Sequence, residues 1–217
     1  MTQVQYILCD VEGTTTDIRF VHNELFPFAR AKLREFYRDH PQEHMHSAHA
    51  LGCTPGEVVT KLESLIDADV KNAELKRVQG KIWAVGYASG ALKGHVYDDV
   101  PLAFARWVAQ GKTLGIYSSG SVQAQQLIYG NSIAGNMCVY LSHHFDLKQG
   151  YKYEAQSYRN ILAELTIDPT SILFLSDVEA ELDAAKSVGM QTIRLFRGRT
   201  EETKHDWQTD FTKIFPV

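Results

Sequence analysis

Residues 7–16 read Ile-Leu-Cys-Asp-Val-Glu-Gly-Thr-Thr-Thr, so an apolar run ends abruptly in two carboxylates, a glycine and three hydroxyls. The apolar run predicts a buried strand, and because side chains alternate along a strand, Asp10 and Glu12 leave its end on the same side. A bound cation such as magnesium would relieve the repulsion between them. Gly13 permits a tight turn whose free N–H groups suit a phosphoryl group. An acidic turn that only ends the strand would show the same pattern, so both interpretations stay open at this point.

Length and charge limit the classes of protein to which the chain can belong. A chain of 217 residues can form one large domain, or a core with an inserted subdomain, without disulfides. Its 22 basic and 26 acidic residues give a net charge of −4, which argues against nucleic-acid binding. Its three cysteines are widely spaced and include no CxxC pair, so neither a disulfide framework nor a zinc site is indicated.

The sequence also lacks the patterns of export and assembly. It shows no signal sequence, and no window approaches the roughly 18 apolar residues of a membrane span. No extended apolar face or heptad repeat is evident. We therefore expect a cytoplasmic monomer that associates neither with membranes nor with nucleic acid.

Apolar spacing changes character near residue 112. From about residue 23 to residue 110 the spacing is helical, and one helix is predicted to follow the start signal Thr54-Pro55-Gly56-Glu57. From Lys112 onward, short apolar runs alternate with helical segments, and strands are predicted at 113–117, 171–175 and 191–195. Such alternation predicts an α/β fold with a parallel sheet covered by helices. Because the first strand is separated from its partners, we expect a core of residues 1–19 and 96–217 with residues 20–95 inserted as a helical cap.

Polar residues follow three of the predicted strands at the point where each strand ends. Asp10 and Glu12 follow the first, Ser118 and Ser119 the second, and Asp177 the strand that ends near Leu175. Ligands of open parallel sheets bind beyond the carboxyl ends of the strands, so we expect these side chains to share one site. Helix caps and turns would explain each group singly, but that explanation must be repeated at every strand end.

Lys152 lies between the second and third of these groups, just ahead of a predicted helix. A lysine at such a position is usually solvated. If its ammonium group instead reaches the cluster, it supplies positive charge for a phosphoryl group and for the carboxylate that attacks it.

The order of these groups resembles the four motifs of the haloacid dehalogenase superfamily. Longer matches are similar to the enolase-phosphatases of methionine salvage, in which glutamate at the position of Glu12 is the usual choice although the superfamily more often has aspartate. The resemblance covers nearly the entire chain, and its longer matches lie at residues 10–16, 92–100, 117–122, 150–154 with 157–158, and 174–178.

The resemblance implies an enzyme that enolises 2,3-diketo-5-methylthiopentyl 1-phosphate, a small-molecule phosphoester, and then dephosphorylates it to the acireductone. It implies Asp10 as the nucleophile that forms an aspartyl-phosphate, and Glu12 as the acid and base. Ser118, Ser119 and Lys152 would bind the substrate. One magnesium ion per chain would be held by Asp10, Glu12 (by its side chain or its backbone carbonyl) and Asp177.

Two rival functions remain from the sequence. One is a generic magnesium-dependent phosphatase of the same superfamily that acts on another sugar or nucleotide phosphate. The other is a phosphate-binding or scaffold protein without turnover, against which the intact acidic and basic groups argue.

Two further patterns are given no function. The histidine-containing stretch from Pro41 to Ser47 is expected to form an exposed loop. Arg194, Arg197 and Arg199 are expected to form a solvated basic tail after the last strand.

Overall fold

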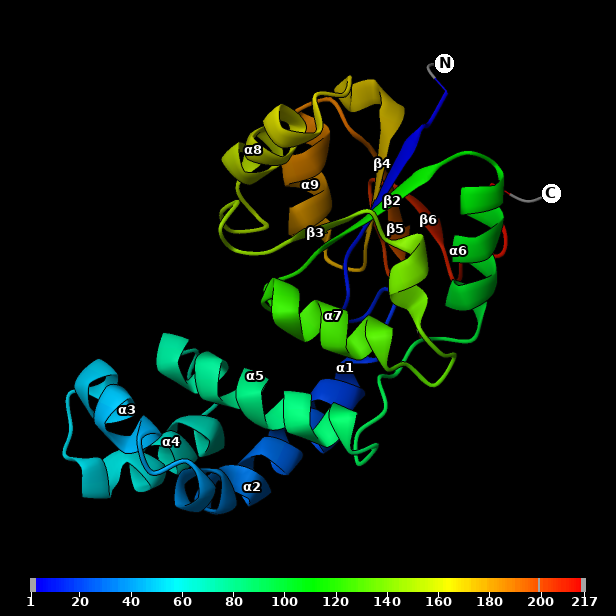
Figure 1. Cartoon of the computed structure of the whole chain (residues 1–217). Helices are drawn as coiled ribbons and strands as arrows, with labels where there is room; N and C mark the ends of the chain where they lie inside the picture. The colour runs from blue at the N-terminus through cyan, green and yellow to red at the C-terminus, as the bar shows by residue number, and fades with distance from the viewer. Residues whose placement is uncertain (1–2, 199, 216–217) are drawn as a thin grey trace. The chain divides into compact units, whose positions relative to one another are not determined.

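The computed structural model describes residues 3–198 and 200–215, and the chain divides into two compact units (Figure 1). One unit comprises Met1–Ile18 and Gly94–Val217, and the other comprises Arg19–Lys93. Arg199, one residue of the predicted basic tail, lies outside the described residues.

The first unit contains a parallel six-stranded sheet in the order β3-β2-β1-β4-β5-β6. The first strand in sequence lies at its centre, where Cys9 is in register with Ile116 of β2 on one side and Leu175 of β4 on the other. The ends of these three strands therefore lie side by side, as the sequence predicted. The strands are β1 (Tyr6–Cys9), β2 (Thr113–Tyr117), β3 (His143–Phe145), β4 (Ile172–Ser176), β5 (Gln191–Leu195) and β6 (Asp206–Gln208).

Helices cover both faces of this sheet, which confirms the predicted α/β class (Figure 1). Alternation along β1 divides its side chains between two cores. Ile7 and Cys9 pack with Phe104 and Trp107 of α6, whereas Tyr6 and Leu8 pack in a second core with residues of α8 and α9. The helices of this unit are α6 (Asp99–Ala109), α7 (Val122–Gly130), α8 (Ala155–Leu165) and α9 (Glu179–Ser187), with two short 3-10 helices, η3 (Met137–Tyr140) and η4 (Pro169–Ser171).

The second unit is helical throughout its described secondary structure. Thr54 and Glu57 form a capping box, so the predicted start signal is confirmed, and the Asn72 side chain caps α5. Whether this unit serves as a cap stays a prediction. Its elements are η1 (Val21–Leu25, a π-helix), α2 (Phe26–Asp39), α3 (Glu43–Leu51), η2 (Pro55–Glu57), α4 (Val58–Asp67) and α5 (Ala73–Ala88), and α1 (Ile18–Phe20) lies at the boundary between the units.

The structure corrects the prediction of a loop from Pro41 to Ser47. Helix α3 begins at Glu43, whose carboxylate pairs with Arg77 and Lys81 of α5. Ser47 is fully buried, and it bonds the Tyr37 hydroxyl at 2.6 Å and the Glu74 carboxylate at 2.5 Å. These tertiary contacts stabilise a helix whose apolar periodicity is weak, which is why the sequence pattern missed it.

Two strands were also missed. Each of β3 and β6 has three residues, and neither contains the apolar run on which a prediction of a buried strand depends. Among the described residues, no helix combines the length and the hydropathy needed to cross a membrane.

Candidate active site

Asp10 stands directly after the central strand and is buried, with 3% of its surface exposed. Its backbone N–H donates to the Leu175 carbonyl at 2.9 Å, which extends the pairing of β1 with β4. One carboxylate oxygen accepts a hydrogen bond from the Thr14 hydroxyl at 3.1 Å, and the other accepts from the Lys152 ammonium group. A carboxylate fixed at both oxygens at the carboxyl edge of a parallel sheet is suited to nucleophilic attack.

The loop after Asp10 folds back on itself. The Val11 carbonyl accepts from the backbone N–H groups of Thr14, Thr15 and Thr16 at 3.2, 2.9 and 2.9 Å. Gly13 has a φ of +79°, and a Cβ atom at this position would overlap the Asp177 carboxylate. Only glycine combines this conformation with so close an approach, so the loops after β1 and β4 are in contact.

Glu12 faces Ser118, whose hydroxyl donates to the Glu12 carboxylate at 3.3 Å. The Ser118 oxygen also accepts the Gly120 N–H at 3.0 Å, so this serine joins the loops after β1 and β2. Burial, and then the negative charge of Asp10, raise the pKa of Glu12 above its usual range. A carboxyl group with a raised pKa can donate a proton near neutral pH. Ser119 is half-buried beside Ser118.

Lys152 is not solvated: its side chain is 7% exposed, and its ammonium group lies between Asp10 and Glu181, 2.7 Å from the Glu181 carboxylate. Burial alone would lower the pKa of Lys152, but the charges of Asp10 and Glu181 outweigh it and raise the pKa above its ordinary value. The lysine therefore stays protonated.

Asp177 contributes the third predicted carboxylate. Its backbone N–H donates to the Thr14 hydroxyl at 3.0 Å, but its buried Oδ1 has no hydrogen-bond partner in the described part of the chain. Burial, and then repulsion from Asp10, raise the pKa of Asp177 to about 7. An unsatisfied carboxylate oxygen beside other carboxylates is what a divalent cation would satisfy, so the donor set fits magnesium.

Protein side chains alone do not form a complete set of metal ligands among the described residues. Over residues 3–198 and 200–215, no group of three or more His, Cys, Asp or Glu side chains is arranged to hold a metal ion. Because magnesium usually binds through one or two carboxylates together with water and substrate phosphate, a site based on Asp10 and Asp177 is in keeping with this ion.

Glu181 is the member of the cluster that the sequence pattern did not single out. Besides its contact with Lys152, its carboxylate accepts a hydrogen bond from the Ser176 hydroxyl at 2.9 Å. Burial, and then the charge of Asp10, raise the pKa of Glu181. The sequence offered no signal for it, because Glu181 lies in the first turn of α9, where acidic residues are common.

The prediction of a solvated basic tail is wrong for the two of its arginines that the structure describes. Arg194 and Arg197 are 12% and 9% exposed in their side chains, and they pair with Glu179 and Asp99. Partner carboxylates that are distant in sequence explain the burial, which a local charge pattern could not show.

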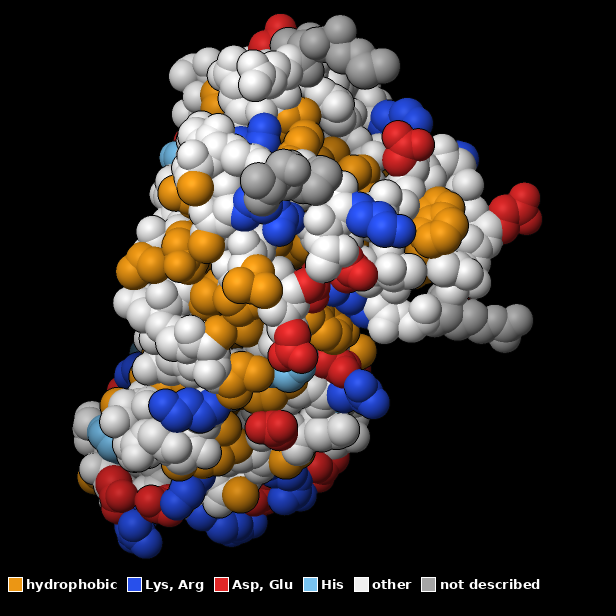
Figure 2. Space-filling view, turned by 90° about the vertical axis from the view of Figure 1, so that its right-hand side faces the viewer, with side chains coloured by type: hydrophobic (Ala, Val, Ile, Leu, Met, Phe, Trp, Pro, Cys, Tyr) orange, Lys and Arg blue, Asp and Glu red, His pale blue; other side chains and the backbone are white. Residues whose placement is uncertain are grey.

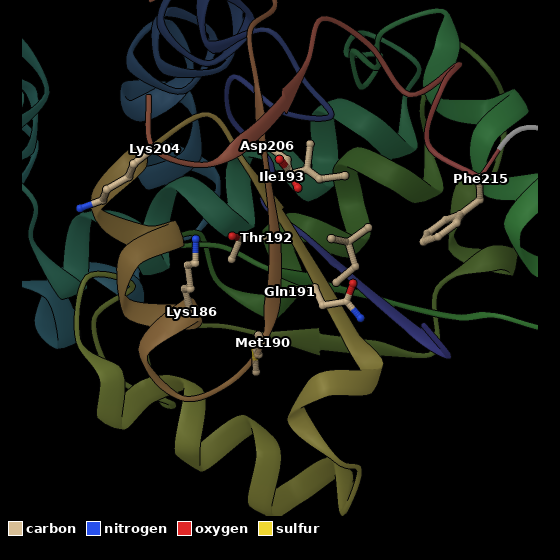
Figure 3. Close-up of a pocket in the computed structure, with 9 residues that line it drawn as sticks. Lys186, Met190, Gln191, Thr192, Ile193, Lys204, Asp206 and Phe215 are labelled. Carbon is tan, nitrogen blue, oxygen red and sulfur yellow. The ribbon is translucent and has the colours of Figure 1, made fainter. Parts of the chain in front are cut away.

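A pocket of about 430 Å³ lies elsewhere in the same unit (Figure 3). It is lined mainly by residues near the amino ends of β4, β5 and β6, whereas the catalytic candidates follow the carboxyl ends. None of the predicted site residues lines it.

Comparisons with known proteins agree with this geometry. The family model of haloacid dehalogenase-like hydrolases matches residues 4–189. Enolase-phosphatase E1 of Drosophila melanogaster is 45% identical, over 96% of this chain and 89% of that protein, and enolase-phosphatase E1 of Enterobacter sp. (strain 638) is 42% identical, over 98% and 97%. The crystal structure of the UTR4 protein from Saccharomyces cerevisiae is similar with a TM-score of 0.85 and 31% identity, covering 97% of this chain and 100% of that chain.

More distant structures share only the fold. CbbY from Rhodobacter sphaeroides, solved in complex with phosphate, has a TM-score of 0.66 and 20% identity over 99% of this chain and 98% of its own. Family model, full-length relatives and fold agree with the resemblance seen in the motifs. The chain therefore belongs to the haloacid dehalogenase-like hydrolases and, within them, to the enolase-phosphatases, which are phosphatase enzymes.

Proposed function

We propose that the protein converts 2,3-diketo-5-methylthiopentyl 1-phosphate to acireductone and phosphate in methionine salvage, by enolisation followed by dephosphorylation. The observation that carries the proposal is the fixed carboxylate of Asp10, held by Lys152 and Thr14 beside the unsatisfied oxygen of Asp177. The choice of this substrate rests on membership of the enolase-phosphatases, because the geometry of the site is compatible with many phosphoesters.

Asp10 is the nucleophile in this proposal. Its carboxylate attacks phosphorus, the bond from phosphorus to the substrate oxygen breaks, and an aspartyl-phosphate forms. Lys152 stabilises the ionised carboxylate and the negative charge of the transferring group. Glu181 keeps Lys152 in place from the opposite side, at 2.7 Å.

Glu12 is the acid and then the base. Its raised pKa favours the protonated form, which can give its proton to the leaving oxygen. The resulting carboxylate takes a proton from the water that attacks the aspartyl-phosphate. Ser118 orients the Glu12 carboxylate, and Ser118 and Ser119 provide hydroxyls for the oxygens of the substrate.

One magnesium ion per chain would be held by Asp10, Asp177 and residue 12, the last through its backbone carbonyl because the Glu12 side chain engages Ser118. When bound, the ion neutralises negative charge on the transferring phosphoryl group and polarises substrate oxygens.

The setting of this reaction is also part of the proposal. The enzyme acts in the cytoplasm as a monomer on a small-molecule phosphoester, without nucleic-acid or membrane partners, and the helical unit, residues 20–95 in the prediction, serves as its cap. The net charge of −4 argues against nucleic-acid partners, and acidic and basic side chains are interspersed on the face shown in Figure 2.

The test follows the diketone phosphate by absorbance while phosphate release is measured in the same reaction. The proposal expects an enol signal that appears before phosphate. Phosphate release without enolisation would instead support the generic phosphatase, and a protein that releases phosphate from no phosphoester, with or without magnesium, would be a binding module.

A further inference from the structure

The loops that carry Asp10 and Asp177 are joined through one threonine. The Thr14 hydroxyl donates to the Asp10 carboxylate at 3.1 Å and accepts the Asp177 N–H at 3.0 Å, and Thr14 is fully buried. Thr14 therefore links the Asp10 carboxylate to the backbone of Asp177, and a displacement of Thr14 would shift one relative to the other. Residues that hold the backbone of Thr14 and Asp177 in place therefore affect the geometry of the proposed metal site.

Arg197 holds the backbone of Thr14. Its Nε donates to the Thr14 carbonyl at 2.8 Å, while Nη1 binds both carboxylate oxygens of Asp99 at 2.7 and 2.8 Å. The guanidinium lies over the rings of Tyr97 and Phe211, with its central carbon 4.3 and 4.8 Å from their centroids. The planar group is therefore fixed by hydrogen bonds along its edge and by contacts with two aromatic rings, which a lysine could not reproduce.

Asp99 is itself fixed, because it accepts the Phe211 N–H at 2.7 Å. The buried Nη2 of Arg197 has no hydrogen-bond partner within the described residues. Burying an arginine with an unsatisfied nitrogen costs free energy, so stability alone is a weak reason for this arrangement.

Arg194 makes the equivalent contact with the other loop. Its Nε donates to the Asp177 carbonyl at 3.1 Å, and Nη1 binds the Glu179 carboxylate at 2.5 Å. The guanidinium also lies over the Phe196 ring at 4.7 Å. Two arginines that lie three residues apart thus each hold one backbone carbonyl, one in each acidic loop.

We propose that Arg194 and Arg197 are positioning residues that set the separation of the Asp10 and Asp177 carboxylates and thereby the affinity of the enzyme for magnesium. This inference rests on the proposed function only in placing the metal between these two carboxylates. Residues that orient metal ligands typically change metal affinity or activity by 10- to 100-fold when they are replaced.

Arg197→Lys and Arg194→Lys test the proposal, and Arg106→Lys is the matched control. Arg106 donates to the carbonyls of Phe211, Ile214 and Phe215, so it anchors the same C-terminal segment as Arg197 but does not contact either acidic loop by a described hydrogen bond. Lysine keeps the charge in all three variants but loses the planar fork.

Magnesium dissociation constants of the metal-free proteins are measured by isothermal titration calorimetry, with thermal unfolding in parallel. We expect Arg197→Lys and Arg194→Lys to weaken magnesium binding by about tenfold or more, and Arg106→Lys to leave it unchanged even where its melting temperature falls equally. If Arg197→Lys does not fold, Arg194→Lys decides alone.

An unchanged dissociation constant in the folded Arg194 and Arg197 variants would overturn the proposal, as would an equal weakening by Arg106→Lys or a wild-type protein that binds no magnesium. Calorimetry needs no phosphoester. A wild-type protein that binds magnesium but does not turn over the diketone phosphate would therefore refute the proposed function while the positioning role stands.

Discussion

Buried and exposed ion pairs of this protein differ in what they can contribute. Around Asp10, Lys152 contacts two carboxylates, and the side chains of Lys152 and Asp10 are only 7% and 4% exposed. In the helical unit, Arg30 pairs with Asp67 at 2.6 Å, but these side chains are 44% and 54% exposed. Exposed pairs contribute about 0–1 kcal/mol, whereas buried charges cost free energy that their partners must offset. The buried cluster is therefore better explained by chemistry than by a contribution to stability.

The largest expected effect is that of Asp10→Asn. An amide cannot act as the nucleophile, so phosphate release should fall by about 10⁴-fold or more, as for other enzymes that lose a nucleophile. The change removes one buried negative charge and keeps the shape, so the fold should survive. Phosphate release from an aryl phosphate with magnesium measures the first expectation, and thermal unfolding measures the second. Turnover near the wild-type rate in the folded variant would remove Asp10 from its role.

Lys152→Met tests the comparison of ion pairs directly. It leaves Asp10 and Glu181 buried without their cation, and we expect the free energy of unfolding to fall by about 3–5 kcal/mol. Arg30→Met is the matched control, because it breaks an exposed pair and should lower the free energy of unfolding far less. Urea unfolding at pH 8 measures both. Equal losses in the two variants would contradict the distinction.

Glu12→Gln should slow phosphate release by about 100-fold or more, because an amide can neither donate the proton to the leaving oxygen nor activate water. Ser118 can still donate to the amide oxygen, so the local structure should be retained. Steady-state rates measure the effect. A burst of the dephosphorylated product before slow phosphate release would indicate that hydrolysis of the aspartyl-phosphate is the slowed step. A near-normal rate would show that Glu12 serves only in the turn.

The smallest effect concerns pH. The pKa of Asp177 is raised to about 7, above its value near 3.9 in an unfolded chain, so the folded state binds the proton more tightly. The stability of the metal-free protein should therefore fall as pH rises from about 4 to 7, and the raised pKa values of Glu12 and Glu181 act in the same direction.

Magnesium requires the ionised carboxylate, so it should raise the melting temperature more at pH 8 than at pH 5.5. Asp177→Asn is the control, in which both the pH dependence and the magnesium effect should shrink. A magnesium effect that is equal at the two pH values would show that Asp177 does not couple the proton to the metal.

The features that the sequence could predict are those with local patterns. Apolar runs located β1, β2, β4 and β5. Because ligands bind at the carboxyl ends of parallel strands, the residues that follow these runs were predicted to lie on neighbouring loops, namely Asp10, Glu12, Ser118 and Asp177. Hydrogen bonds that link Asp10, Thr14 and Asp177, and Glu12 and Ser118, support that placement.

What escaped prediction depends on contacts between residues that are distant in sequence. Ser47 is buried against Tyr37 and Glu74, which the loop-like composition around it did not indicate. Arg197 is buried against Asp99, although its sequence context predicted a solvated basic tail. Glu181 has the sequence context of an ordinary acidic residue in the first turns of a helix, and only its contact with Lys152 distinguishes it. Charge patterns in sequence show which residues are ionised, but not which are buried together.

The most direct test of the central claim is to trap the phosphoryl group on Asp10. Glu12→Gln enzyme is mixed with the diketone phosphate and magnesium, quenched in acid and reduced with borohydride, which converts an aspartyl-phosphate to homoserine. We predict homoserine at position 10 by peptide mass spectrometry, and none in Asp10→Asn. Phosphate release from the Glu12→Gln enzyme with unmodified Asp10 throughout the reaction would contradict the proposed mechanism.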